Sequence, residues 1–192
     1  MVLLNVGSGH SRDVPRIYEG WEQDTLDIDA NVRPDIVCDA RQMSRLPSGK
    51  YDAVHSSHCL EHFHKHEILA VLSGFLHVLK PTGFAHVIVP NMTVLFAEIA
   101  GRDIDDVWYR SAVGPITFHD VIYGLSRAVA QGNSHYSHKT GFTEKSLAKV
   151  LRAAAFKTVI TAVDDCGNLF AFAFKVKPSK TRLRRLANAD HC

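Results

Sequence analysis

Apolar and polar residues alternate in blocks along the first 91 residues of the chain. The short apolar runs predict strands over 3–6, 25–30, 34–40, 51–57 and 84–91. Apolar residues repeat at helical spacing over 67–79, and Lys80-Pro81-Thr82-Gly83 stops that helix. Consecutive strands with a helical crossover predict an α/β fold. Its sheet should be Rossmann-like, doubly wound and mostly parallel.

The C-terminal half follows a different pattern. Thr143 is placed to cap a helix, and apolar residues over 157–163 and 169–176 predict a β-hairpin that closes a seven-stranded sheet with antiparallel strands. Between the halves, residues 91–142 contain acidic residues, aromatic residues and the helix breakers Gly and Pro without a regular pattern. We call this stretch the insertion, and we expect it to form a lid on the substrate side. Ser11 to Trp21 has room for a helix of two or three turns at most.

Composition is that of a globular protein with one domain over residues 1–176 and a basic tail over 177–192. The chain has 22 Lys and Arg against 20 Asp and Glu, and its basic excess lies in the tail, which we expect to be solvated. No apolar run is long enough for a membrane span, and nothing at the N-terminus reads as a signal peptide. Four scattered cysteines, Cys38, Cys59, Cys166 and Cys192, read as reduced thiols, which favours a cytoplasmic protein.

The candidate chemistry begins where the first strand ends. Two glycines, Gly7 and Gly9, follow it at once, as in a turn where the backbone approaches a ligand closely. Asp27 lies 18 positions after Gly9 at the end of the second strand, where a carboxylate can accept hydrogen bonds from ribose hydroxyls. Without further context an ordinary turn, with Asp29 as its cap, would explain the same residues.

Four segments together resemble the class I S-adenosylmethionine-dependent methyltransferases, and the likeness covers residues 1–176. They are Leu4-Asn5-Val6-Gly7-Ser8-Gly9, Leu26-Asp27-Ile28-Asp29, Val37-Cys38-Asp39-Ala40, and a long run from Tyr51 through Leu60-Glu61-His62 to Leu79-Lys80-Pro81-Thr82-Gly83. The long run is the most specific, and it is similar above all to small stand-alone bacterial-type members. The sequence lacks the family's helix ahead of the first strand and the Asn/Asp-Pro-Pro-Tyr/Phe motif of many amino-methylating enzymes.

The resemblance implies a site for S-adenosylmethionine, with S-adenosylhomocysteine as product. The glycine backbone would lie against the methionine portion, Asp27 would hold the ribose, and Asp39 with the amide of Ala40 would meet the adenine. The full set of expected cofactor residues is Asn5, Val6, Gly7, Ser8, Gly9, Asp27, Ile28, Asp39, Ala40, Ser57 and His58.

A hydroxyl acceptor needs a base near neutral pKa, and histidine has that property. The candidates are His58, just past the fourth strand, and His119 and His138 in or beside the insertion. His62 and His66 could share a helical face as metal ligands, but the Leu-Glu-His segment is explained by the resemblance, so no metal is expected. Trp108 and Tyr109 would contact substrate or pack inside the insertion.

The resemblance therefore implies a methyltransferase, and likeness to the same family favours a small-molecule or saccharide hydroxyl as the acceptor. The alternatives are an RNA methyltransferase guided by the basic tail, although nucleic acid is not the expected partner, and a non-catalytic module that binds S-adenosylmethionine. A nicotinamide dehydrogenase is disfavoured, because Arg12 stands where a third glycine would fall and because a hairpin closes the sheet. The sequence leaves the oligomeric state open.

Overall fold

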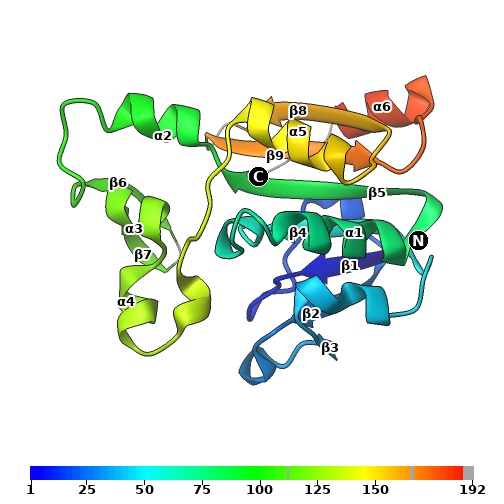
Figure 1. Ribbon diagram of the computed structural model, residues 1–192, viewed down its shortest axis with the longest axis horizontal. Coiled ribbons are helices and arrows are strands. Elements are labelled where there is room, and N and C mark those ends of the chain that lie inside the picture. Colours follow the sequence, from blue (N-terminus) through cyan, green and yellow to red (C-terminus); the bar gives the residue numbers. More distant parts are fainter. Residues whose placement is uncertain (112, 165–166, 188–192) are drawn as a thin grey trace.

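The computed structural model describes residues 1–111, 113–164 and 167–187, which include a seven-stranded sheet in the order β3-β2-β1-β4-β5-β9-β8 (Figure 1). The strands β1 to β5 pair in parallel, and β9 runs antiparallel between β5 and β8. Their bounds are β1 Val2–Val6, β2 Glu22–Asp27, β3 Ile36–Val37, β4 Tyr51–Ser57, β5 Leu79–Pro90, β8 Thr158–Val163 and β9 Asn168–Phe174. The predicted fold class is confirmed, including the closing hairpin.

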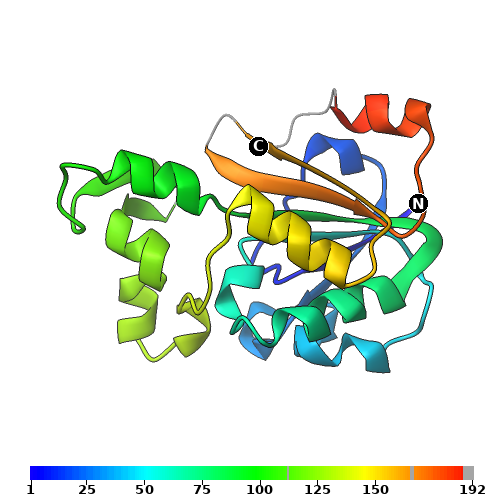
Figure 2. The same cartoon turned by 45° about the horizontal axis from the view of Figure 1, so that its top comes forward.

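One face of the sheet is covered by two amphipathic helices, α1 (Ile68–Val78) and α5 (Glu144–Ala153), and by the 3-10 helix η3 (Ala40–Arg45) (Figure 2). Helix α1 forms where the apolar spacing predicts it, and Val71, Phe75 and Val78 on its inner side are fully buried. Helix α5 begins at the predicted cap, because the Thr143 side chain accepts a hydrogen bond from the amide of Ser146. These elements form the main core and fix the sheet edge where the site lies.

The opposite face is covered by the 3-10 turn η1 (Arg16–Tyr18) and by helix α6 (Lys180–Ala187) (Figure 2). The expected helix over 11–21 is therefore reduced to one turn. The expectation of a solvated tail is wrong for α6, because Leu183 and Leu186 pack against apolar residues of the sheet. Leu186 is only 8% exposed. The net charge of the tail does not reveal this packing. It arises because the two leucines, three residues apart, lie on one side of the helix.

Strands β2, β3 and β5 differ most from their expected ranges. Strand β3 has only two residues because it pairs with β2 alone at the edge of the sheet. Strand β2 ends at Asp27, so Asp29 caps the following turn η2 (Ala30–Val32). Strand β5 begins at Leu79, directly after α1, and a register shift against β4 accommodates the Pro81 and Gly83 segment.

The insertion projects beyond the carboxyl edge of the sheet (Figure 1). It contains α2 (Met92–Glu98), β6 (Val107–Ser111), β7 (Gly114–Thr117), α3 (Phe118–Tyr123), α4 (Ser126–Ala130) and η5 (Ser134–Tyr136). It has its own small core, in which the ring of Trp108 stacks on Phe118 with centroids 5.4 Å apart. Trp108 therefore packs inside the insertion, which is one of the two roles considered for it. Within the described ranges, no helix has the length and apolarity that a membrane crossing requires.

Candidate active site

The turn after β1 is held by the carboxylate of Asp27. One oxygen accepts a hydrogen bond from the amide of Gly9 and the other from the amide of Asp29, both at 2.9 Å. Gly7 (φ 70°) and Gly9 (φ 54°) both have left-handed backbone. A Cβ added at Gly7 would lie 2.6 Å from the sulfur of Cys59, so this position has no room for a side chain. The end of β2 and the glycine turn are thus one connected structure.

A cavity of about 440 Å³ opens beside this turn, at the carboxyl ends of β1, β2 and β4. The structure brings all the expected cofactor residues to its wall except Asn5. Asn5 is buried inside β1, in register with Thr25 and His55. The other expected residues, which line the cavity, are Val6, Gly7, Ser8, Gly9, Asp27, Ile28, Asp39, Ala40, Ser57 and His58.

The far wall of the cavity contains Arg41, which was not predicted from the sequence, and Asp39. The Asp39 side chain caps η3 by accepting from the amide of Arg41 at 2.9 Å, and the Arg41 guanidinium pairs with it and with Glu67. Hydrogen bonding from Arg41 holds the pKa of Asp39 below its ordinary value, although partial burial opposes this. Asp39 is therefore an anchored carboxylate at the cavity wall.

The remaining wall comes from the insertion, through Asn133 to Tyr136 and Lys139. The amides of Lys139 and Thr140 donate to the carbonyl of Glu61 at 2.8 and 3.1 Å, which ties this return segment to the turn after β4. Sequence reasoning expected a lid but did not identify Asn133 to Tyr136 as residues that line the cavity, because loop residues without periodicity carry no local signal of what they cover.

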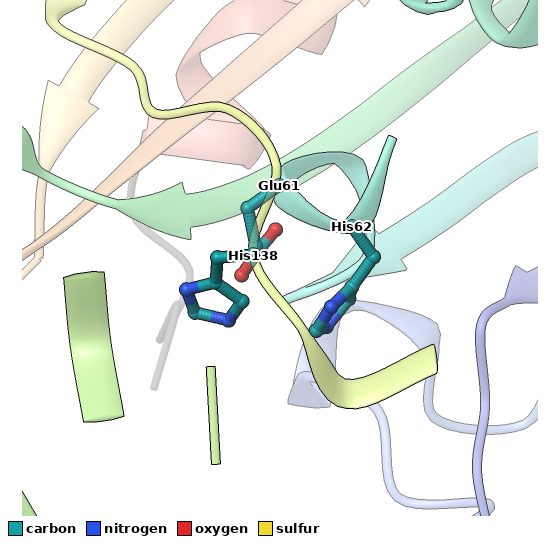
Figure 3. A group of neighbouring side chains, drawn as sticks. All are labelled: Glu61, His62 and His138. Carbon is teal, nitrogen blue, oxygen red and sulfur yellow. The ribbon is translucent and has the colours of Figure 1, made fainter. Parts of the chain in front are cut away.

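Glu61 is the most unusual group at the site. It belongs to the turn η4 (Leu60–His62), is 1% exposed, and neither carboxylate oxygen has a hydrogen-bond partner among the described residues. Its carboxylate and the rings of His62 and His138 point toward one another (Figure 3). One ligand atom from each of the three residues lies within 4.8 Å of the others. The Nδ1 atom of His58 lies 3.4 Å from one Glu61 oxygen, an ion-pair contact.

Charge at this cluster is unevenly distributed. Burial acts to raise the pKa of Glu61, but contact with His58 and the proximity of the His62 and His138 imidazoles keep it below its ordinary value. The pKa of His58 is raised, because the Glu61 carboxylate outweighs the effect of burial. The pKa of His138 is lowered, mainly by burial. The structure therefore favours an ionised carboxylate among three imidazoles.

The three histidines considered as bases lie in different places. His58 lines the cavity, has left-handed backbone (φ 49°) and leaves 45% of its side chain exposed. His138 lies behind the wall, where its Nδ1 is 2.8 Å from the carbonyl oxygen of Val121. His119 lies in α3 with its Nδ1 3.1 Å from the Ser126 hydroxyl, and it does not line the cavity. Of the three, His58 has direct access to a bound molecule.

The described cysteines, Cys38 and Cys59, are free thiols. Burial raises the pKa of the Cys59 thiol to about 12, so it stays protonated and acts as a packing residue. Cys166 and Cys192, also expected to be reduced, lie outside the described residues.

Residues 4–87 match the family model described as a methyltransferase domain. No curated protein shows significant similarity to the chain. Among solved structures, the fold is similar to 1,6-didemethyltoxoflavin-N1-methyltransferase of Burkholderia thailandensis with bound 1,6-didemethyltoxoflavin and S-adenosylhomocysteine. That match has 17% identity and a TM-score of 0.55, and it covers 92% of this chain and 71% of that one.

Two further structures show the same fold. A SAM-dependent methyltransferase from Archaeoglobus fulgidus has 15% identity and a TM-score of 0.59, with 91% of this chain and 86% of that chain covered. An O-methyltransferase family protein from Burkholderia thailandensis has 12% identity and a TM-score of 0.56, with 93% and 52% covered. At these identities the likeness concerns the fold.

Proposed function

We propose that this chain, a class I S-adenosylmethionine-dependent methyltransferase by its fold and by the family match over residues 4–87, transfers a methyl group to an oxygen of a small-molecule acceptor. The observation that carries the proposal is the glycine turn held by Asp27 at the mouth of a 440 Å³ cavity. The acceptor class is the finer part of the proposal, and it needs its own test.

The described residues fit S-adenosylmethionine in three respects. A Cβ at Gly9 would meet no atom within 4 Å, so its backbone faces open space where a ligand can approach. Each oxygen of Asp27 accepts one amide hydrogen bond and keeps a lone pair for a ribose hydroxyl. Asp39 and Ala40 follow β3 on the same wall, where the Asp39 carboxylate can accept a hydrogen bond from the amino group of adenine.

The bound cofactor would supply an electrophilic methyl carbon on a sulfonium, so the protein needs no nucleophile of its own. The protein then contributes the correct positioning of the two reactants and a site from which water is excluded. The glycine turn and Asp27 hold the cofactor. Residues Asn133 to Tyr136 of the insertion cover the cavity and exclude water.

His58 is the residue we propose for removing the proton from the acceptor hydroxyl. Its ring lines the cavity, and with Nδ1 facing Glu61 the Nε2 atom remains to accept the proton. A small acceptor fits a cavity that the insertion partly covers. One of the similar structures holds bound 1,6-didemethyltoxoflavin, which supports a small acceptor, and another is named an O-methyltransferase family protein, which supports transfer to oxygen.

The first experiment is calorimetric titration of the purified protein with S-adenosylmethionine and S-adenosylhomocysteine, beside Asp27→Ala. We expect binding by the wild type and a loss of at least about tenfold in affinity in the variant, which removes a charged hydrogen-bond acceptor. Asp105→Ala, an exposed carboxylate of the insertion, is the matched control and should bind as the wild type does.

Wild-type protein that binds neither compound would refute the proposal. Binding that survives in Asp27→Ala would instead assign the ribose to Asp29, which also lines the cavity. Binding of cofactor without methyl transfer to any hydroxyl compound in an extract would support the non-catalytic alternative.

A further inference from the structure

Glu61, His62 and His138 come from two segments that are far apart in the sequence but adjacent in the fold (Figure 3). We propose that these three side chains bind a divalent transition metal, with Zn²⁺ as the preferred ion. The sequence analysis considered His62 with His66 and expected no metal. In the structure His66 is exposed and stacks on His64 instead, with ring centroids 5.6 Å apart, whereas His138 reaches Glu61 from the insertion.

The two histidines are oriented as metal ligands are. The Nδ1 atom of His62 lies 3.1 Å from the carbonyl oxygen of Ser137, and that of His138 lies 2.8 Å from the carbonyl oxygen of Val121. A carbonyl only accepts, so each Nδ1 carries the proton and each Nε2 keeps a free lone pair. Imidazoles that bind metals through Nε2 use this same backbone contact to fix their tautomer and orientation.

The carboxylate provides the second, independent observation. A buried carboxylate oxygen without a hydrogen-bond partner is costly, and both Glu61 oxygens are of this kind. The ion-pair contact from His58 involves only one of the two. A cation between Glu61 and the two rings would satisfy the other oxygen, which explains why this residue is held where water does not reach it.

The donor set selects the type of metal. Two imidazoles and one carboxylate suit zinc and similar transition metals, whereas Mg²⁺ and Ca²⁺ prefer sites made of oxygen ligands. Two donors each about 2.1 Å from a tetrahedral zinc ion lie about 3.4 Å apart, so donor atoms as far as 4.8 Å apart must move closer by up to about 1.4 Å on binding. Three protein ligands leave a fourth tetrahedral position open, as in catalytic zinc sites.

The proposed metal ligands reach the proposed reaction site, because His62 itself lines the cavity together with His58 and Lys139. If the proposed function holds, an acceptor oxygen could take the open coordination position, and coordination would lower the pKa of its hydroxyl. Metal binding itself does not depend on that function, because it requires only the three side chains.

The test is metal binding by the protein without cofactor. Wild type and variants are dialysed against Zn²⁺, the bound metal is measured by mass spectrometry, and Co²⁺ is then titrated while its visible absorption reports coordination geometry. We expect one tight equivalent in the wild type, and a loss of affinity of more than about 100-fold in His62→Gln and His138→Gln, since losing even an outer-shell partner costs 10–100-fold.

The double variant His64→Gln/His66→Gln is the matched control, because it removes two exposed imidazoles from the same segment. It should keep the tight equivalent. Glu61 is buried, so Glu61→Gln is interpreted only if its circular dichroism matches the wild type. No tight equivalent in the wild type, or one that survives in His138→Gln, overturns the proposal. Titration with S-adenosylhomocysteine on the same samples shows separately whether the cofactor site is intact.

Discussion

Gly7 and Gly9 share a left-handed backbone but differ in what surrounds them. Gly7 faces the buried Cys59 side chain, so its missing side chain is required by packing. Gly9 faces open space at the cavity, so its missing side chain leaves room for a ligand. The same residue type thus serves the fold at one position and the site at the other.

We predict that alanine at the two positions separates these roles. Gly7→Ala should lower the free energy of unfolding by about 3 kcal/mol, because backbone strain of about 1–2 kcal/mol adds to a steric clash. Gly9→Ala should lower it by only about 1 kcal/mol, yet weaken binding of S-adenosylhomocysteine severely. Urea unfolding and calorimetry measure the two effects. Equal losses of stability in both variants would contradict this assignment.

At the scale of elements, helix α6 covers apolar residues on the face of the sheet opposite α1 (Figure 2). Its basic residues do not all face solvent. The guanidinium of Arg182 lies over the ring of Phe84, 5.0 Å from the centroid, and an Arg182 nitrogen donates to the carbonyl of Thr82. Part of the positive charge that the sequence assigns to a tail is therefore used in packing.

We expect Leu186→Ala to lower the free energy of unfolding by about 2 kcal/mol, because it removes buried methyl groups and leaves a cavity. Leu69→Ala is the control, since Leu69 is 45% exposed on α1 and its truncation should cost less than about 0.5 kcal/mol. Urea denaturation of both variants against the wild type gives the comparison. A similar small change in both would show that α6 contributes nothing to stability.

At the scale of the whole molecule, the dependence of stability on pH follows from polar groups inside the fold. His55 is 3% exposed in β4, packed against Tyr18 and His86, and its Nδ1 has no hydrogen-bond partner among the described residues. Burial, with a smaller effect of the nearby His58 charge, lowers the pKa of His55 to about 4. The folded protein therefore keeps this imidazole neutral where the unfolded chain would protonate it.

Because the unfolded state binds the proton first, stability should fall as pH decreases from about 6.5 to about 4, by roughly 3 kcal/mol from this group. Above pH 6.5 both states are neutral and the group contributes no slope. Partly buried carboxylates such as Asp52 have pKa values lowered by their partners, so their contribution to stability is lost only below this window. In His55→Leu the slope between pH 6.5 and 4 should decrease, as urea unfolding at several pH values can measure. An unchanged slope would assign it to other groups.

The sequence by itself determined the fold class and most of the residues that line the cavity from the sheet, where we propose that the cofactor binds. Strand and helix periodicity is local, and a parallel sheet places the carboxyl ends of its strands on one edge, so Gly7, Asp27 and Asp39 had to gather there. Asn5 is the exception, because alternation along β1 turns it away from the cavity.

The tertiary structure alone decided what faces that edge. Which loop residues of the insertion cover the cavity depends on packing between segments more than 70 residues apart, as in the contact between His62 and Ser137. The same packing brings His138 to Glu61, and separate long-range contacts pack α6 on the opposite face of the sheet. Such contacts follow from the three-dimensional path of the chain, and local patterns of apolar and polar residues carry no record of that path.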